Sequence, residues 1–281
     1  MRGSWQDPVT WDAALAECRA RYPLQEMAID GASWSFLDTG AGAATLLLLP
    51  GAMGFADTSF HFVLAFAPQM RVLSVSYPPA LTDGDRLVDE LAVLLATRGV
   101  AAAHVVGGSY SGLVAQRLAE RHPQQVCALI LANTWAADPG RARWFRPAAW
   151  LVAHTPARLV QRLLGGYKDR FLPSDDPATC FWRSYFEAIL PAFTPALIAS
   201  RLHAFASLDT AHWPSASVWP GPVLLVESTD DRLFGERSRR ALPVRYSHAQ
   251  VVKLDYPGHA AALTHVGDYV RLYRDWMVYE H

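Results

Sequence analysis

The feature that most constrains this chain is a serine flanked by glycines, Ser109, which lies between an apolar β-type run and a helical pattern. Residues 105–113 read Val-Val-Gly-Gly-Ser-Tyr-Ser-Gly-Leu. A serine at the tip of a sharp turn from strand to helix has a strained backbone, and only neighbours without side chains let the flanking backbones pass. Gly107 and Gly112 provide that room. The motif is G-x-S-x-G with one departure, because Ser111 stands where the second glycine usually falls.

This placement favours a nucleophilic role for Ser109. A helix that begins directly after the serine points its first NH groups and its positive dipole end at an oxyanion formed there. A phosphate-binding loop would need a lysine and then a serine or threonine after Gly112, but Leu113 and Val114 follow it. A dinucleotide-binding motif needs a different glycine spacing. The motif alone also fits an ordinary glycine and serine loop before a helix, so the rest of the chain must decide.

Strands and helices alternate through the first half of the sequence. This spacing predicts right-handed βαβ crossovers and a parallel sheet that is covered by helices on both faces. Alternating apolar residues on either side of Asp30 and Gly31 predict an antiparallel hairpin at a sheet edge. The first 22 residues predict a peripheral helix that packs on the sheet. The expected strands are 45–49, 71–75, 104–106 and 128–132, and the expected helices are about 58–66, 85–97 and 110–120.

The alternation stops after residue 133 and resumes near residue 221. Between these points we find helical fragments crowded with large aromatic residues, a pattern that predicts an inserted helical cap, or lid. Strands at 223–226 and 250–254 and helices near 236–242 and 266–279 then complete the alternation. The expected organisation is a core in two parts, residues 1–133 and 221–281, interrupted by a cap at 134–220.

Histidine and acidic residues occur where a serine nucleophile would need them. A serine hydroxyl becomes a good nucleophile when a neutral histidine accepts its proton and a carboxylate fixes the tautomer of that histidine. In open α/β sheets ligands bind at the carboxyl ends of the strands, so the partners should lie in loops directly after strands. Residues 228–233 follow one strand and contain Asp230 and Asp231, and His259 follows the last strand. The chain order is therefore serine, acid, histidine.

With these three motifs in this order, over about residues 24–276, the chain resembles an α/β-hydrolase. The resemblance implies a doubly wound, mostly parallel sheet with an inserted helical cap. It also implies that Ser109 is the nucleophile, His259 the base and Asp231 the orienting acid, because an apolar pair follows that acid after one residue. Asp230 is the alternative acid.

The family's oxyanion hole uses two backbone NH groups, and the resemblance places them at Ala52 and Tyr110. Where the family commonly has His-Gly, this chain has Pro50-Gly51. Because the donors are backbone amides, this change need not abolish the hole.

The cap is also expected to contribute to the substrate pocket, because a lid over an active site usually lends it part of its apolar face. An alternative is that these aromatic residues form only a hydrophobic core. The residues we assign to the pocket are Met53, Trp135, Trp144, Phe145, Trp182 and Phe186.

The composition limits the partners. A formal net charge of −1 over 281 residues gives no global attraction to nucleic acid or to anionic membranes, so a small-molecule substrate is expected. Cys18, Cys127 and Cys180 are widely spaced and odd in number, which argues against a disulfide framework and a zinc site. We see neither a signal peptide nor a membrane-spanning run, and we expect a soluble cytoplasmic protein without metal or cofactor.

The cap carries many basic residues with few acids nearby. They are either a solvated helix face or a docking patch for an acidic carrier protein or a carboxylated substrate. They are Arg141, Arg143, Arg146, Arg158, Arg162, Lys168 and Arg170.

The sequence thus predicts a serine hydrolase of the carboxylesterase or thioesterase kind, acting on an ester or thioester with an apolar acyl or aromatic part. The same triad also serves carbon–carbon bond hydrolysis, lyase and acyl-transfer reactions, and fold alone does not choose between them. The elbow, residues 107–110, is similar to that of the proline iminopeptidases. Residues 24–38 and 129–138 resemble maspardin, a branch regarded more as a binding protein. That branch lacks the catalytic histidine, so His259 favours an enzyme.

Overall fold

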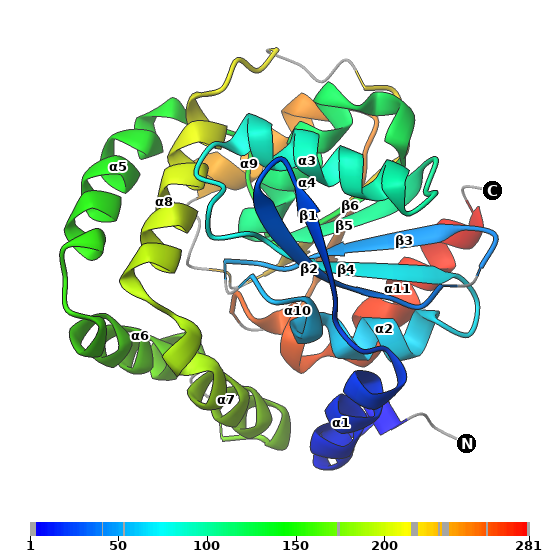
Figure 1. The fold of residues 1–281 in the computed structure, drawn as a ribbon. Helices are drawn as coiled ribbons and strands as arrows, with labels where there is room; N and C mark the ends of the chain where they lie inside the picture. The colour runs from blue at the N-terminus through cyan, green and yellow to red at the C-terminus, as the bar shows by residue number, and fades with distance from the viewer. Residues whose placement is uncertain are drawn as a thin grey trace.

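The computed structural model describes residues 4–40, 42–52, 54–172, 175–214, 219–229, 231, 236–256 and 258–279. Within them an eight-stranded sheet has the order β1-β2-β4-β3-β5-β6-β7-β8 and lies between two layers of helices (Figure 1). The strands are β1 (Gln25–Ile29), β2 (Ala32–Asp38), β3 (Thr45–Leu49), β4 (Arg71–Ser76), β5 (Ala103–Gly108), β6 (Val126–Ala132), β7 (Val223–Ser228) and β8 (Gln250–Leu254).

The expected hairpin and the mostly parallel sheet are both confirmed. β1 and β2 pair antiparallel around Asp30 and Gly31, whose φ angles are 44° and 85°. Positive φ at both central residues is what a tight two-residue hairpin turn requires. β2 also pairs antiparallel with β4, and every later pair from β4 to β8 is parallel. The carboxyl ends of β3, β5, β6, β7 and β8 therefore lie at one edge of the sheet.

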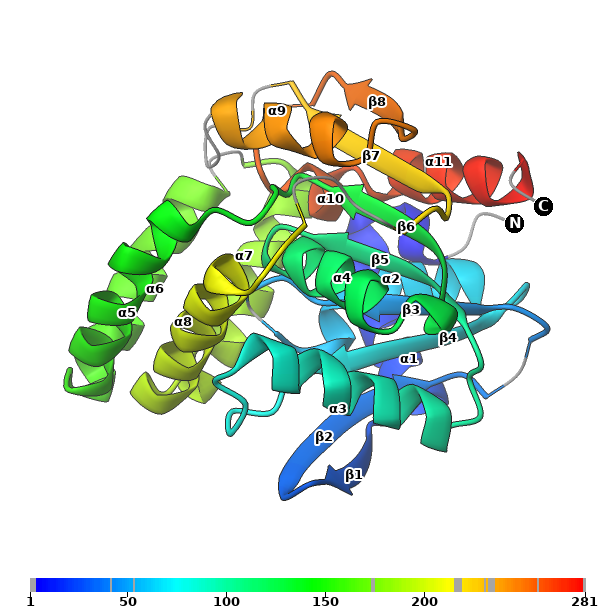
Figure 2. The ribbon, with the colours of Figure 1, turned by 90° about the horizontal axis from the view of Figure 1, so that it is seen from above.

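Each face of the sheet has its own helical layer (Figure 2). Because side chains alternate along a strand, Leu47 and Leu49 of β3 join one core cluster, and Leu46 and Leu48 join the other. The first layer contains α3 (Gly84–Thr97), α4 (Tyr110–Arg121) and α9 (Glu236–Arg245). The second contains α1 (Trp11–Arg21), α2 (Phe60–Phe66), α10 (Ala261–Thr264) and α11 (Val266–Tyr279).

The N-terminal helix α1 packs mainly on α2. Its buried residues belong to the same core cluster as Leu46 and Leu48 of the sheet. Short 3₁₀ segments complete the core: η1 (Ser4–Gln6), η2 (Pro8–Thr10), η3 (Ala56–Ser59) and η4 (Pro123–Gln125).

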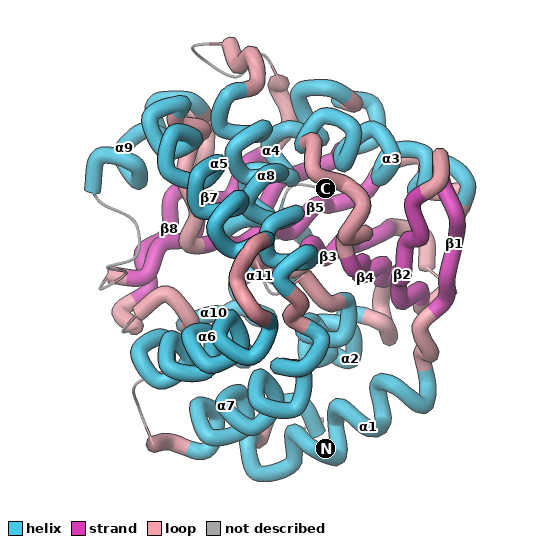
Figure 3. The backbone as a smooth tube through the Cα atoms, turned by 60° about the vertical axis from the view of Figure 1, so that its left-hand side comes forward, coloured by secondary structure: helices cyan, strands magenta, loops and turns pink. Residues whose placement is uncertain are grey.

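Four helices lie between β6 and β7, where the alternation stops in the sequence. They group together beside the sheet (Figure 3), and α5 packs along α8. Within the described residues no single helix is long and apolar enough to cross a bilayer. One pair of helical segments, 177–192 and 195–210, has the length and composition for it only when the two are taken together, and they are bent by 103° where they meet. We call these helices the helical insertion: α5 (Pro139–Ala153), α6 (Ala157–Phe171), α7 (Pro177–Ile189) with η5 (Leu190–Ala192), and α8 (Pro195–Thr210).

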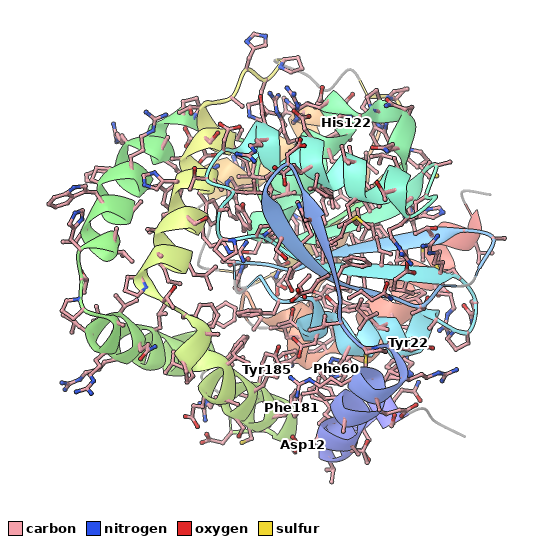
Figure 4. The ribbon with its side chains drawn as sticks, in the orientation of Figure 1. Asp12, Tyr22, Phe60, His122, Phe181 and Tyr185 are labelled. Atoms are coloured by element: carbon pink, nitrogen blue, oxygen red, sulfur yellow. The ribbon has the colours of Figure 1, made fainter. Side chains whose placement is uncertain are left out.

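Aromatic contacts attach the insertion to the core through α7. Phe181 lies with its ring centroid 5.5 Å from that of Phe60 in α2, and Tyr185 donates a hydrogen bond of 2.7 Å to Asp57 (Figure 4). Trp182 is fully buried and donates from Nε1 to the carbonyl oxygen of Leu263, at 2.9 Å. Large aromatic side chains in such pairs add specific geometry to their buried area. The contacts therefore fix α7 against both α2 and α10.

A buried histidine, His61, lies inside this aromatic group. Its ring contacts Phe60, Trp11 and Trp182, with centroids 3.6, 4.2 and 5.7 Å away. Burial lowers the pKa of His61 well below the usual value for histidine. The neutral ring is therefore the form that packs here.

This packing predicts an acid-sensitive contact between α2 and α7. Below pH ~6.5 the unfolded chain binds a proton at His61 that the folded chain does not bind, so the free energy of unfolding falls as the pH is lowered. His61→Phe has no group that binds this proton. Its free energy of unfolding should therefore rise, relative to that of the wild type, by up to about 1.4 kcal/mol for each pH unit below 6.5. Urea denaturation at pH 8, 6 and 5 measures the difference. The prediction is contradicted if the free energies of unfolding of the wild type and of His61→Phe differ by the same amount at all three pH values.

Candidate active site

The backbone at Ser109 has the strained geometry that the sequence predicted. Its φ and ψ are 55° and −126°, and it is one of three residues other than glycine with positive φ in the described chain. Such a conformation costs about 1–3 kcal/mol and persists only where the surroundings hold it. The Ser109 amide donates to the carbonyl oxygens of Ala132 and Asn133 at 3.1 and 3.2 Å. The hydroxyl of Thr134 donates to the Ser109 carbonyl oxygen at 2.6 Å.

Two glycines make this turn possible. A Cβ at Gly107 would lie 2.5 Å from the carbonyl oxygen of Ser111, and a Cβ at Gly112 would lie 2.2 Å from the hydroxyl oxygen of Thr134. Both distances are far below van der Waals contact, so any side chain would push the strand and the helix apart. The glycines are thus steric requirements of the turn.

The off-pattern residue Ser111 braces the elbow. Its hydroxyl accepts a hydrogen bond from the Gly108 amide at 2.9 Å and lies 2.8 Å from the carbonyl oxygens of Leu49 and Gly108, to either of which it can donate. The side chain is fully buried and is not part of the cavity wall described below. Its contacts join the end of β3 to the turn that carries Ser109.

The structure also brings the predicted base and acid together. His259 Nδ1 lies 2.7 Å from Asp231 Oδ2, and the two side chains are only 8% and 2% exposed. A carboxylate at Nδ1 fixes the tautomer in which Nε2 accepts a proton. Asp231 follows β7 and His259 follows β8, as the chain order predicted. The alternative acid, Asp230, lies outside the described residues.

Asn133, which the sequence analysis missed, connects the loops that carry these residues. It follows β6 with a φ of 44°. Its side-chain amide donates to the Ser228 hydroxyl at 2.8 Å and to the His259 carbonyl oxygen at 3.3 Å, and its Oδ1 accepts from the Ser228 amide at 2.9 Å. Its carbonyl oxygen accepts from the Ser109 amide. The available signal was an asparagine, which tolerates positive φ, directly after a predicted strand.

A cavity of about 290 Å³ joins these groups. Ser109, His259 and Ala52 lie in its wall, and most of the remaining wall is apolar. Tyr110 begins α4, so its amide is at the amino end of that helix, while its side chain is buried against Phe205 with ring centroids 4.2 Å apart. The assignment of these two amides as oxyanion donors stays a prediction.

Of the six residues assigned to the pocket, Phe186 alone among those described lies in the cavity wall. Met53 lies outside the described residues. The prediction is corrected for the other four: Trp135 and Phe145 stack on Phe205 in the core, Trp182 is buried between α7 and α2, and Trp144 is 68% exposed on α5.

The wall instead includes apolar residues that the sequence analysis did not single out. Phe62 comes from α2, Tyr273 from α11, and Leu164 and Phe171 from α6. The ring of Phe171 lies edge-on to that of His259, with centroids 5.7 Å apart. A count of aromatic residues could not find them, because the side that each helix turns to the cavity depends on tertiary packing.

Arg201 of α8 connects the insertion to the loop after β3. Its side chain is buried, and Nη2 donates to the Tyr77 carbonyl oxygen at 3.0 Å and lies 3.5 Å from that of Gly54. Burial lowers the pKa of Arg201. Because Gly54 is close in sequence to Ala52, this arginine restrains the loop that carries a predicted oxyanion donor.

The basic residues of the insertion do not form one uniform face. Arg141 makes an ion pair with the buried Asp209, at 2.9 Å, and its guanidinium lies over the ring of Trp135. It therefore has a structural role. Arg143, Arg146, Arg158 and Arg162 are exposed, and the side chains of Lys168 and Arg170 lie outside the described ones. Among the residues described, no group of three or more His, Cys, Asp or Glu side chains is arranged to hold a metal ion.

Comparison with known proteins assigns the family. The family model for the alpha/beta hydrolase fold matches residues 78–266, and together with the sheet and the elbow this shows that the chain belongs to the α/β-hydrolase family. A hydrolase from Pseudomonas aeruginosa PA01 has a similar structure, with a TM-score of 0.76 and 22% identity over 91% of this chain and 98% of that one. The doubly wound fold is confirmed.

Two sequence relatives cover most of the chain. RutD of Stutzerimonas stutzeri (strain A1501), a proposed carbamate hydrolase, is 26% identical in an alignment that covers 81% of this chain and 85% of RutD. The polyketide synthase ThaQ of Burkholderia thailandensis is 28% identical in an alignment that covers 94% of this chain but 13% of the synthase. The chain is thus similar both to a free-standing hydrolase and to a portion of a much larger synthase.

The contacts of Ser111 predict that its hydroxyl stabilises the fold and takes no part in the reaction. Ser111→Gly should retain covalent labelling of Ser109 by a fluorophosphonate. It should lower the free energy of unfolding by about 1–3 kcal/mol, because buried backbone groups lose a partner. Labelling followed by mass spectrometry and urea denaturation measure the two effects. Loss of labelling in a variant with the wild-type circular dichroism spectrum would disprove the bracing role.

Proposed function

We propose that this protein is a serine hydrolase that cleaves an ester or thioester of a largely apolar small molecule through an acyl-enzyme intermediate. One observation carries the proposal: the strained Ser109 and His259 lie in the wall of one mostly apolar cavity, and His259 is hydrogen-bonded to Asp231. Nucleophile, base and orienting acid are the groups that acyl transfer requires. This reaction corresponds to the esterase and thioesterase class, EC 3.1.

In the first half of the reaction, Ser109 Oγ forms a bond to the substrate carbonyl carbon while His259 Nε2 takes the hydroxyl proton. The bond from that carbon to the leaving oxygen or sulfur then breaks, and His259 gives the proton to the leaving atom. In the second half, water bonds to the acyl carbon and gives a proton to His259. The bond from that carbon to Ser109 Oγ then breaks, and His259 returns the proton to Oγ. The products are a carboxylic acid and an alcohol or thiol.

The carbonyl oxygen gains negative charge in both halves. The amides of Ala52 and Tyr110 are the proposed donors to it, and the amino end of α4 adds a favourable dipole. In such sites the loss of one donor costs about 3–4 kcal/mol. We therefore assign a positioning role to two sets of contacts. Those of Arg201 restrain the loop that carries Ala52, and those of Ser111 restrain the elbow that carries Tyr110.

A thioester attached to a carrier protein is one form that this substrate can take. The similarity to a portion of a polyketide synthase supports it. The exposed Arg146, Arg158 and Arg162 of the insertion would attract an acidic carrier. Arg141 is excluded from this surface by its ion pair with Asp209.

A second candidate function is cleavage next to a substrate amine, as in the proline iminopeptidases. The specific observation is Glu187 of α7, a carboxylate in the cavity wall that would attract an ammonium group. Turnover of prolyl p-nitroanilide but not of p-nitrophenyl esters would favour this candidate.

The proposed function predicts covalent chemistry at Ser109. The wild type should react with a fluorophosphonate probe and hydrolyse p-nitrophenyl esters. Ser109→Ala should lose labelling and hydrolysis, because it lacks the nucleophile. His259→Ala should also lose both activities, because no base activates the Ser109 hydroxyl. Mass spectrometry of the labelled peptide and initial rates test this. An unlabelled wild type without turnover would favour the non-catalytic, maspardin-like alternative.

The proposed role of Asp231 predicts a contrast with its neighbour. Asp231→Asn should lower kcat by roughly 10⁴-fold, because an amide stabilises the wrong histidine tautomer. The matched control, Asp230→Asn, should keep kcat within about threefold of the wild type, since the proposed triad does not use Asp230. Initial rates with one p-nitrophenyl ester measure both. The reverse pattern would make Asp230 the acid.

A further inference from the structure

The solvent-facing side of α5 and α6 carries a group of large apolar side chains. These two helices lie at the edge of the molecule that is away from the sheet (Figures 1 and 2). One side of α5 packs along α8, and α6 contributes Leu164 and Phe171 to the cavity wall. We call the exposed side of the two helices the outer surface. Its large apolar residues are Trp144, Trp150 and Leu151 of α5 and Leu159 and Leu163 of α6.

These apolar side chains are well exposed. Trp144 and Trp150 are 68% and 63% exposed, whereas no other tryptophan of the described residues is exposed. Leu159 and Leu163 are 47% and 65% exposed and lie one helical turn apart, so they share one side of α6. A single exposed apolar residue needs no explanation. A group of them on two consecutive helices marks a surface that contacts another molecule or a membrane.

The outer surface is also positively charged. Residues 139–168 contain six basic residues and no acidic one, although the whole chain has a formal net charge of −1. Arg141 is excluded from the surface by its ion pair with Asp209. The exposed arginines are Arg143, Arg146, Arg158 and Arg162. This local charge favours an anionic partner.

The charge argues against a second copy of this chain as the partner. A two-fold symmetric interface places the same patch on both subunits, so arginines would face arginines. Like charges brought together out of water repel each other strongly. An acidic carrier protein would satisfy the arginines, but its charged surface gives no partner to the exposed tryptophan and leucine side chains.

A membrane surface with anionic lipids satisfies both kinds of side chain. Tryptophan and leucine insert at the boundary between headgroups and acyl chains, and basic residues of the same helices bind the lipid phosphates. Arg158 and Arg162 are one turn apart and directly precede Leu159 and Leu163, so α6 presents its apolar and basic pairs side by side. The guanidinium of Arg143 lies over the ring of Trp144, 5.4 Å from its centroid.

We propose that the outer surface binds reversibly to a membrane that contains anionic lipid, with its tryptophan and leucine side chains inserted and its arginines on the lipid phosphates. The near-neutral net charge of the chain does not oppose this binding, because exposed charges act over only about 10 Å at 0.1 M salt. The inference does not depend on the chemistry at Ser109. Because α6 also walls the cavity, binding would hold the cavity close to apolar molecules dissolved in the bilayer.

The test is flotation of the purified protein with vesicles of phosphatidylcholine alone or of phosphatidylcholine mixed with phosphatidylglycerol, the anionic vesicles. The wild type should bind the anionic vesicles more than tenfold more tightly, since each arginine near an anionic surface contributes about fivefold. Raising the salt from about 0.05 to 0.5 M should remove most of this preference, because the charges are then screened.

Two double variants separate the charge from the apolar contact. Arg158→Gln with Arg162→Gln should weaken binding to the anionic vesicles about 25-fold, which is about fivefold for each arginine. Leu159→Ser with Leu163→Ser should weaken it about tenfold or more, but should keep its dependence on salt. Trp144→Ser is the corresponding variant of α5 and should weaken binding in the same way. All these side chains are exposed, so the circular dichroism spectrum should stay that of the wild type.

Lys253→Gln and Leu24→Ser are the matched controls. They change an exposed lysine and an exposed leucine that lie outside the insertion, so both should bind the anionic vesicles within about twofold of the wild type.

Four outcomes would overturn the proposal. The first is a wild type that does not bind the anionic vesicles. The second is binding that the controls weaken as much as the variants of the outer surface do. In the third, size-exclusion chromatography finds a dimer that Leu159→Ser with Leu163→Ser dissociates, without vesicle binding, and the surface is then an interface between copies. In the fourth, an acidic acyl carrier protein binds in place of vesicles and Arg158→Gln with Arg162→Gln abolishes this binding, so the partner is a protein.

Discussion

The backbone conformation of Ser109 is the constraint on which the rest of the site depends. Its positive φ turns the chain from β5 into α4 within one residue and presents the hydroxyl at the sheet edge. The turn closes only because Gly107 and Gly112 leave room for Ser111 and Thr134. The strain of about 1–3 kcal/mol is offset by hydrogen bonds to the Ser109 amide and carbonyl, each of which contributes about 1 kcal/mol.

Hydrogen bonds also hold the elbow in a fixed position relative to the other loops of the site. Parallel pairing sets β5, β6, β7 and β8 side by side, so the loops that follow them begin at one edge. Asn133 then joins the elbow, Ser228 and the His259 carbonyl through its own backbone and side chain. Asn133 therefore links Ser109 to the loop of His259 through one main-chain contact and the hydrogen bonds of its side chain. A site built in this way loses little side-chain entropy when a substrate binds.

The sequence predicts the reactive groups better than it predicts their surroundings, for a physical reason. The elbow, the strands and the loop positions of Asp231 and His259 depend on local patterns of a few residues, so they can be read in order along the chain. The pocket wall depends on how α2, α6, α7, α10 and α11 pack. Trp135 and Phe186 have similar aromatic character in the sequence, but one stacks in the core and the other lines the cavity. Asn133 was missed because its role consists of contacts with residues up to 126 positions away.

The wall of the cavity is adjustable at some positions and not at others. Leu48, Val106 and Ala132 are fixed by strand register, since a shift of one residue would turn the other side chains of β3, β5 and β6 toward the cavity. Larger side chains there would also collide with the core between the sheet and α2. Tyr273 is fully buried, so its truncation would leave a void among packed groups. Phe62 is only partly buried and lies on a short helix, so changes in its size disturb the fold least. The shape of the cavity is therefore most easily changed at Phe62.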